Sequence, residues 1–181
     1  AALFDAIDHA SWKIGVSVKT KWIDAEKVEK EGDEIIGKPD GIIVPIGWGK
    51  RGAEGMIQTA SFARENKIPY LGLCFGMQMA AVEFARNVLG YKKANSEEVD
   101  EKTPEKIIHI MPGQKAYLAK KQFGGTIRLG AWDCRVKKGS LLWEIYKKRE
   151  ISERHRHRYE FNNAYRKAFE KNGILFSGLS P

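Results

Sequence analysis

Two short apolar runs, each followed by a segment with helical spacing, constrain the fold of this chain more than any other feature. The runs at 40–45 and 68–73 are predominantly apolar, which is typical of strands covered on both faces. After the first run, Met56, Ile57 and Ala60 fall at the spacing of one helix face. This alternation predicts an α/β fold with a three-layer, open, mostly parallel sheet and helices on both faces.

Weaker patterns extend this prediction along the chain. Gly90 suits the end of a helix that begins at the second run. Helices are expected at 3–12, 53–67, 75–88, 140–148 and 163–173, and further strands at 16–22, 107–111, 125–130, 134–136 and 174–178. The strands after Asn95 are expected to form an antiparallel extension, and 112–125 a mobile loop. No internal repeat or linker interrupts the pattern, so one domain over residues 1–181 is expected.

Composition narrows the class of protein. No apolar run approaches the ~20 residues of a membrane span, so no membrane partner is expected. The net charge of +8 invites a nucleic-acid interpretation, but the basic residues are scattered. Their one dense cluster, "ERHRHRYE" at 153–160, is flanked by glutamates, so no nucleic-acid partner is expected. Two cysteines give no disulfide framework, which favours a reducing cytoplasm.

Cys74 lies at the corner between a predicted strand and a predicted helix. In "PYLGLCFGMQ", at 69–78, glycines stand two residues to either side of it. Such glycines permit the sharp strand–turn–helix corner that exposes a nucleophile at the C-terminal edge of a sheet. The N-terminus of the helix that follows is expected to lower the pKa of the thiol. The alternative is a buried structural cysteine, the role expected for Cys134, which lacks such surroundings.

Five blocks together carry a family resemblance that covers nearly the whole chain. The segment "PYLGLCFGMQ" resembles the nucleophile segment of class I glutamine amidotransferases. "VEFARNVLG", "ANSEE", "GGTIRLG" and "ERHRHRYEFN" follow it in the family's order. The set is similar to one branch of that family, the glutaminase domains of CTP synthases, for which the run "ERHRHRYE" is highly specific.

The resemblance implies an activity and a site. It implies hydrolysis of the glutamine amide through a cysteine thioester, with the ammonia passing to a synthetase domain that makes CTP from UTP. By motif match Cys74 is the nucleophile, and Gly47 and the backbone of Phe75 form the oxyanion hole. The implied substrate-binding residues are Gly47, Phe75, Gly76, Met77, Gln78, Glu98 and Arg158. Alternatives stay open, since Gln78 could face solvent, Glu98 could be one of several loop acids, and the arginine–histidine run could be solvated.

The same resemblance implies the partners of the domain. L-glutamine is the expected substrate, and an oligomer is expected through the full-length enzyme. ATP and magnesium are expected only in the synthetase domain, and no cofactor or metal in this one. The absence of a GxxxxGK[ST] loop agrees with nucleotide binding elsewhere.

Three departures from the family pattern raise a second interpretation. The family supplies its base and orienting carboxylate from a late "HPE" segment, whereas this sequence ends at Pro181, before such a segment. The family's first strand is also missing. Ile46 replaces a glycine before Gly47, and three outcomes stay open: strain at Ile46, a displaced Gly47 N–H, or an ordinary φ with Ile46 packed against Trp48 and the oxyanion hole intact. The alternative function is a non-catalytic binding or regulatory domain with an incomplete triad.

Overall fold

The computed structural model describes residues 2–111 and 128–181, so the loop predicted at 112–125 lies outside the described residues. The helices are α1 (Ala2–Ile14), α2 (Ala25–Glu31), η1 (Asp33–Ile36), α3 (Ala53–Glu65), α4 (Phe75–Asn87), α6 (Leu141–Tyr146), η3 (Asn163–Tyr165) and α7 (Arg166–Lys171). The strands are β1 (Ile42–Val44), β2 (Tyr70–Gly72), β3 (Ala94–Ser96), β4 (Glu105–Ile110), β5 (Arg128–Val136), β6 (Glu150–His157), β7 (Tyr159–Phe161) and β8 (Gly178–Leu179).

The predicted α/β fold with open sheets is confirmed. The parallel arrangement holds for β1 with β2 and for β3 with β4, whereas β4–β7, β5–β6 and β5–β8 are antiparallel. In the part of the chain that is described, the strands form three small sheets, in the orders β1-β2, β3-β4-β7 and β6-β5-β8. The predicted single sheet is therefore divided, and the antiparallel extension predicted after Asn95 is the larger part of the β-structure.

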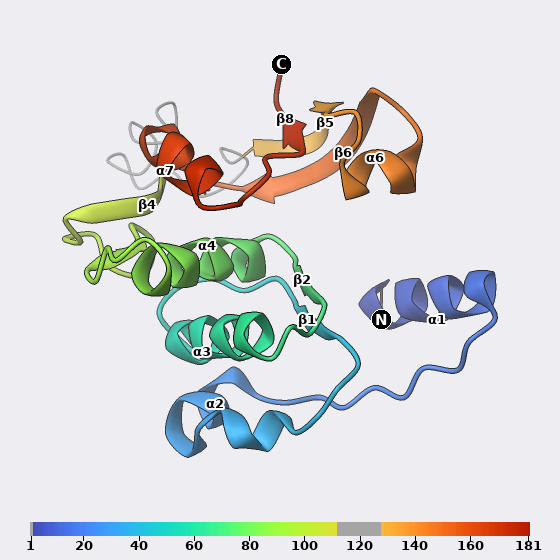
Figure 1. The fold of residues 1–181 in the computed structure, drawn as a ribbon, viewed down its shortest axis with the longest axis horizontal. Coiled ribbons are helices and arrows are strands. Elements are labelled where there is room, and N and C mark those ends of the chain that lie inside the picture. The colour runs from blue at the N-terminus through green and yellow to red at the C-terminus, as the bar shows by residue number, and fades with distance from the viewer. Residues whose placement is uncertain (1, 112–127) are drawn as a thin grey trace.

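Helix α4 is the centre of the hydrophobic core. Its inner face carries Phe75, Met79 and Val82, each at most 1% exposed. These side chains pack with residues of α3, β4 and α7, among them Ile57 and Phe169. Figure 1 shows α4 between α3 on one side and the C-terminal elements on the other. Because α4 begins directly after Cys74, burial of this helix fixes the position of the cysteine.

Two predictions about strands are wrong in detail. Residues 16–22 alternate in sequence but form no strand, because no strand of the described chain pairs with them and Val16 and Val18 stay exposed. The last strand is β8 at Gly178–Leu179 rather than the apolar run at 174–178. Ile174 and Phe176 of that run pack instead against the core from outside a strand.

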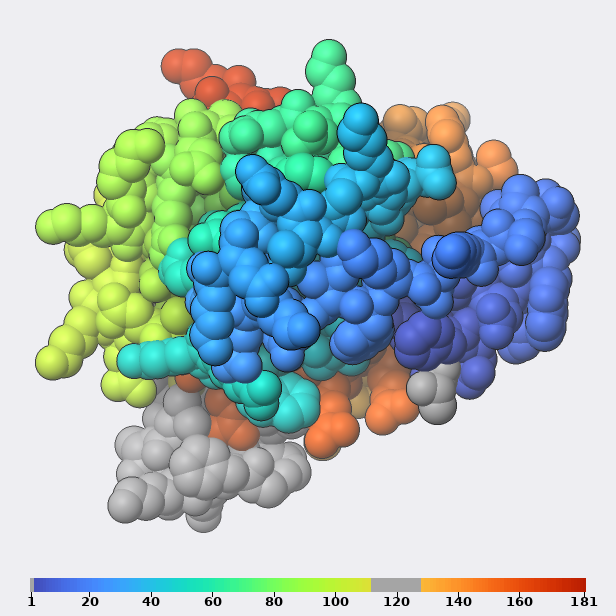
Figure 2. All heavy atoms as spheres, turned by 90° about the horizontal axis from the view of Figure 1, so that it is seen from below, coloured from blue at the N-terminus to red at the C-terminus, as the bar shows by residue number. Residues whose placement is uncertain are grey.

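The N-terminal segment lies at one edge of the molecule. Helix α1 buries only Ser11, and Trp12 is 72% exposed. Phe4 and Trp22 contact each other there, with ring centroids 6.0 Å apart. In Figure 2 this segment, drawn in blue, projects beside the rest of the chain. Over the described ranges, no helix combines the length and the apolar character that a membrane span requires.

The strands β1 and β2 also differ from the prediction in their burial. Ile43 and Leu71, paired with each other in the register, are exposed rather than covered. Val44, on the other face of β1, is buried. This small sheet is therefore covered by helices on one face and open on the other.

Candidate functional site

Cys74 adopts a strained backbone conformation at the junction of β2 and α4. Its φ of 54° and ψ of −104° place it in a region that a residue with a side chain rarely occupies. Such a conformation costs about 1–3 kcal/mol and persists only where the surrounding structure imposes it. The corner predicted from the two glycines is therefore present.

The glycines on either side of Cys74 are required by close backbone contacts. A Cβ atom on Gly76 would lie 2.2 Å from the carbonyl oxygen of Val44 in β1. A Cβ atom on Gly72 would lie 2.5 Å from the backbone nitrogen of Met77. The first turn of α4 thus packs directly on the end of β1, and no other residue fits at these two positions.

The predicted lowering of the Cys74 pKa by the helix N-terminus is present, but other contributions outweigh it. Burial raises the pKa of Cys74 above its ordinary value, and the nearby Glu98 carboxylate raises it further. The N–H of Phe75, at the helix N-terminus, lowers the pKa as expected but does not outweigh the burial. The raised pKa disfavours the thiolate, so a nucleophilic role requires a base.

The loop after β1 reaches the start of α4. A Cβ atom on Gly47 would lie 3.0 Å from Cδ1 of the Phe75 ring, so the two predicted oxyanion residues are neighbours. Ile46, before Gly47, does not have a positive φ and is exposed, as is Trp48. The strain predicted at Ile46 is therefore absent, because the loop accommodates the side chain by directing it into solvent.

Glu98 bonds to the loop that follows β1. Its Oε1 accepts a hydrogen bond from the N–H of Gly49, at 3.0 Å, in the same loop as Gly47. Burial raises the pKa of Glu98, while the Gly49 N–H and the charge of Arg158 oppose the rise. Because Glu98 in turn shifts the pKa of Cys74, the three predicted residues Cys74, Glu98 and Arg158 lie within electrostatic reach of one another.

Gln78 is buried beneath the site rather than facing solvent. It is 4% exposed and lies one helical turn after Cys74. Its Nε2 donates to the carbonyl of Tyr159 at 3.3 Å, whereas its Oε1 is buried and has no partner in the described chain. A buried acceptor without a donor is unfavourable unless a ligand supplies one. Met77, the preceding predicted residue, is partly exposed at 46%.

Sequence reasoning missed two residues that organise these side chains. Gly49 supplies the N–H that holds Glu98, and Tyr159 supplies the carbonyl that holds Gln78. Both contribute backbone atoms, which side-chain chemistry does not reveal. The only sequence signals were their positions, within the loop "IGWGKRG" and directly after the arginine–histidine run.

The four histidines of the sequence all bond or pack elsewhere than at Cys74 in the described structure. His9 lies on α1 beside Trp12, and His109 of β4 pairs with Glu160 at 3.8 Å. His155 and His157 bond to each other, and His157 alone also bonds to the carbonyl of Tyr159. In residues 2–111 and 128–181, no hydrogen bond joins a histidine to the Cys74 thiol.

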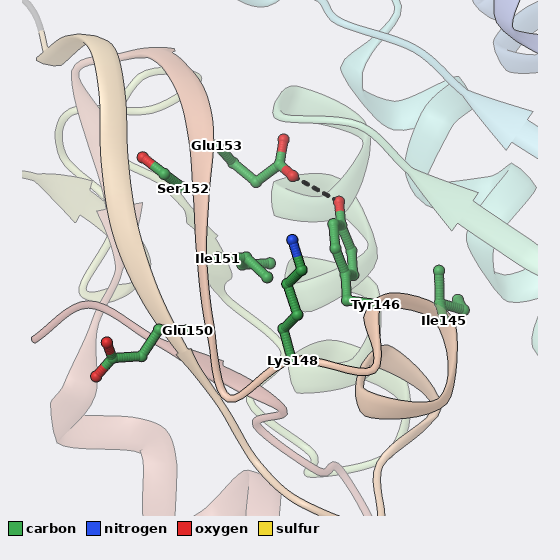
Figure 3. Close-up of a pocket in the computed structure, with 7 residues that line it drawn as sticks. All are labelled: Ile145, Tyr146, Lys148, Glu150, Ile151, Ser152 and Glu153. Atoms are coloured by element: carbon green, nitrogen blue, oxygen red, sulfur yellow. Dashed lines mark hydrogen bonds between the residues drawn. The ribbon is translucent and has the colours of Figure 1, made fainter.

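Cys134 and a nearby pocket belong to a different part of the molecule. Cys134 lies in β5, where a Cβ on Gly178 would come within 2.7 Å of its sulfur, in agreement with a packing role. The pocket is lined by Ile145, Tyr146, Lys148, Glu150, Ile151, Ser152 and Glu153. Figure 3 shows Tyr146 and Glu153 meeting across it through a 2.7 Å hydrogen bond, while Glu150 points away. No residue of the Cys74 site lines this pocket, so the pocket is not the candidate active site.

A metal site is not built from the side chains that the structure describes. No group of three or more histidine, cysteine, aspartate and glutamate residues converges there with a geometry that could hold an ion. The functional groups that the structure describes at Cys74 are a thiol, backbone N–H groups and a carboxylate.

Comparisons with known proteins identify the family of this chain. A family model described as glutamine amidotransferase class-I matches residues 2–180. A CTP synthase of Pyrococcus abyssi is 52% identical over 97% of this chain and 32% of its own length. A CTP synthase of Staphylococcus carnosus is 49% identical over 99% of this chain and 33% of its own length.

A solved structure extends the comparison to three dimensions. It is the glutaminase domain of a Trypanosoma brucei CTP synthase with bound acivicin, and the match has a TM-score of 0.90 at 35% identity. The match covers 99% of this chain and 68% of the trypanosomal one. The chain spans about a third of the length of the curated relatives that it matches. The chain therefore belongs to the class I glutamine amidotransferases, within the branch formed by the glutaminase domains of CTP synthases.

Proposed function

We propose that this chain hydrolyses the side-chain amide of L-glutamine through a thioester on Cys74. The observation that carries the proposal is the conformation of Cys74, with a φ of 54° between two glycines that backbone contacts require. A fold that keeps a strained cysteine at a strand–helix corner supports a chemical role for that residue, because a purely structural thiol needs no such corner.

The proposed reaction has two steps. The Cys74 sulfur, after loss of its proton to a base, attacks the amide carbon of glutamine. The C–N bond then breaks as the protonated base returns the proton to the nitrogen, which leaves as ammonia. Water then attacks the thioester, which releases glutamate and restores the thiol. The N–H groups of Gly47 and Phe75 are the proposed donors to the oxygen that becomes negative in both steps.

The substrate's amino-acid end is proposed to bind at Gln78 and Glu98. Both present oxygen acceptors, and the Oε1 of Gln78 is buried without a donor. The α-ammonium of glutamine supplies donors and a positive charge that would lower the raised pKa of Glu98. Arg158 is proposed to contribute through its backbone and its charge near Glu98. Gly76 and Met77 complete the proposed pocket at the start of α4.

The destination of the ammonia is proposed from the relatives. Because the chain corresponds to a third of CTP synthases, we assign ammonia delivery to a synthetase domain that converts UTP to CTP. ATP and magnesium are assigned to that domain, and oligomer formation to the full-length enzyme. The two free cysteines support a cytoplasmic setting.

One observation favours a second function, that of a non-catalytic glutamine-binding domain. The pKa of Cys74 is raised, and none of the described histidines contacts it. Binding needs only Gln78, Glu98 and the loop at Gly47, whereas turnover also needs a base. The two functions share the binding step and differ in whether glutamate is released.

Alkylation of the two cysteines tests the proposal. Glutamine is expected to protect Cys74 from iodoacetamide, and Cys134 serves as an internal control on the same chain. Peptide mapping measures both modifications with and without glutamine. Equal protection of both cysteines, or protection of neither, would contradict the site. Release of glutamate separates the enzyme from the binding domain, since only the enzyme produces it.

A further inference from the structure

A chain of hydrogen bonds connects the hairpin formed by β5 and β6 to the substrate site. His155 Nδ1 lies 2.8 Å from His157 Nε2, and His157 Nδ1 lies 2.9 Å from the carbonyl oxygen of Tyr159. The same carbonyl accepts a hydrogen bond from the Nε2 of Gln78 at 3.3 Å. Two donors from distant elements thus converge on one backbone oxygen.

The carbonyl of Tyr159 is available because of its place in the sheet. Strand β7 is the edge strand of the order β3-β4-β7. Tyr159 is opposite Ile110, and the next pair along carries the ladder bond, from Met111 N–H to the Arg158 carbonyl. In an antiparallel ladder such bonds occur at alternate pairs, so the Tyr159 carbonyl points away from β4. A carbonyl has two lone pairs, and His157 and Gln78 fill them.

This carbonyl determines the orientation of the Gln78 amide. A carbonyl oxygen cannot donate, so the end of the amide that faces Tyr159 must be the NH₂ group. The Oε1 of Gln78 is then directed away, where it is buried and unpartnered. An acceptor in that position suits an ammonium group, which carries donors only.

The hydrogen bonds also define the tautomers of the two histidines. His157 donates from Nδ1 to the carbonyl, so in its neutral form Nε2 is an acceptor, and His155 donates to it from Nδ1. Burial lowers the pKa of both rings, and the charge of Arg128, opposite His157 in the register, lowers both further. Glu153 opposes the shift at His155 and Glu160 opposes it at His157.

We propose that His157 is a positioning residue for glutamine binding, which acts through the Tyr159 carbonyl on the side chain of Gln78, with His155 holding the ring of His157. This inference rests on the proposed function, because it assigns Gln78 to the substrate. The ring of His157 need not touch the substrate itself. His157 holds the Tyr159 carbonyl in place, and this carbonyl holds the NH₂ group of Gln78. The Oε1 of Gln78 is therefore presented in one orientation.

Three substitutions at His157 separate this role from a merely structural one. In Asn the amide nitrogen lies where Nδ1 of histidine lies, so His157→Asn keeps the donor to Tyr159. In Gln the amide nitrogen lies one carbon further, so His157→Gln moves the donor away. His157→Ala removes it. Arg156→Ala is the surface control, since Arg156 is exposed on the other face of β6.

The measurement is the dissociation constant for L-glutamine by titration calorimetry on the whole chain. We expect roughly tenfold weaker binding for His157→Ala and His157→Gln, as for loss of one hydrogen bond. His157→Asn and Arg156→Ala should stay within about threefold of the unaltered chain. Equal affinity of the His157→Asn and His157→Gln variants for glutamine would overturn the inference. If His157→Ala fails to fold, the comparison of these two variants is sufficient for the test.

A second readout works without a ligand. The side-chain NH₂ resonances of Gln78 in ¹H–¹⁵N spectra, assigned through their loss in Gln78→Met, report directly on the bond to Tyr159. They should shift in His157→Gln and remain in place in His157→Asn. No glutamine binding by the unaltered chain would count against the proposed function. Unmoved resonances in His157→Gln would count against the positioning role.

Discussion

The helix that begins at the Cys74 corner is largely buried, whereas the β5–β6 hairpin is largely exposed. Helix α4, which begins at the corner, has seven buried residues, whereas Val136 is the only buried residue of β5 and β6 has none among its described positions. The corner is therefore held by the buried face of α4, and the hairpin by its own ladder. Substitutions at the corner should be costly, and those in the hairpin should matter only where it reaches the site.

The largest expected effect comes from Gly76→Ala. The added Cβ would lie 2.2 Å from the Val44 carbonyl, so β1 and α4 must separate. Overpacking of this kind against backbone should lower the free energy of unfolding by about 3 kcal/mol or more. Urea unfolding measures it. Gly41→Ala is the matched control, because its Cβ would meet only the Pro69 carbonyl, at 3.7 Å. A similar small loss in both variants would refute the close contact.

The second prediction concerns Cys74→Gly, which should raise the stability of the fold while abolishing the reaction at the corner. Cys74→Gly removes the side chain from a residue at φ 54°, which relieves strain but adds freedom to the unfolded chain. The net expectation is a rise of about 1 kcal/mol in the free energy of unfolding, with complete loss of glutamine-dependent chemistry. Thermal unfolding of both proteins checks the first part. A less stable glycine variant would show that the conformation is not strained.

The pH dependence of stability should report on Glu98. Its folded-state pKa is raised, mainly by burial, so the folded chain binds a proton more readily than the unfolded chain. Stability is therefore gained below the ordinary pKa of glutamate and lost as the pH rises through the folded value. Glu98→Gln should remove this loss, so that the variant unfolds at higher urea concentration at pH 7 and at a similar concentration at pH 4. The same variant should bind glutamine more weakly. Parallel pH profiles of the two proteins would contradict the assignment.

The smallest effect is expected in the hairpin, at Tyr146→Phe. The phenol donates to Glu153 at 2.7 Å, but Tyr146 is exposed, so water replaces the bond. Removing the hydroxyl should change the free energy of unfolding by no more than about 0.5 kcal/mol, and glutamine binding should be unaltered. A loss as large as that of Gly76→Ala would mean that the hairpin is as tightly held as the corner.

The sequence predicted the corner well because its requirements are local. Two glycines, an apolar strand and a helical pattern all lie within about 20 residues, and each restricts the backbone on its own. The family resemblance grouped Gln78 and Glu98 with Cys74, and the structure places both close to it, while their role in binding stays a prediction. The burial of Gln78 followed from no local pattern.

The incorrect predictions concern properties that depend on parts of the chain far apart in sequence. The pKa of Cys74 depends on how deeply packing buries it and on Glu98, neither of which a helix N-terminus reveals. Residues 16–22 have strand-like alternation, but a strand forms only with a partner. His155 and His157 were grouped with a charged run, and only the folded structure shows that His157 bonds to the Tyr159 carbonyl and His155 bonds to His157.

The bond from Gln78 to Tyr159 joins residues 81 positions apart, and this spacing has a consequence during synthesis. Ribosomes add roughly 5–20 residues per second, so Tyr159 emerges on the order of 4 to 16 seconds after Gln78. During that interval the corner can fold on α3, but the amide of Gln78 has no carbonyl to orient it. The nascent chain therefore carries its cysteine for several seconds without a completed glutamine site, and the site is assembled only once the hairpin has been made.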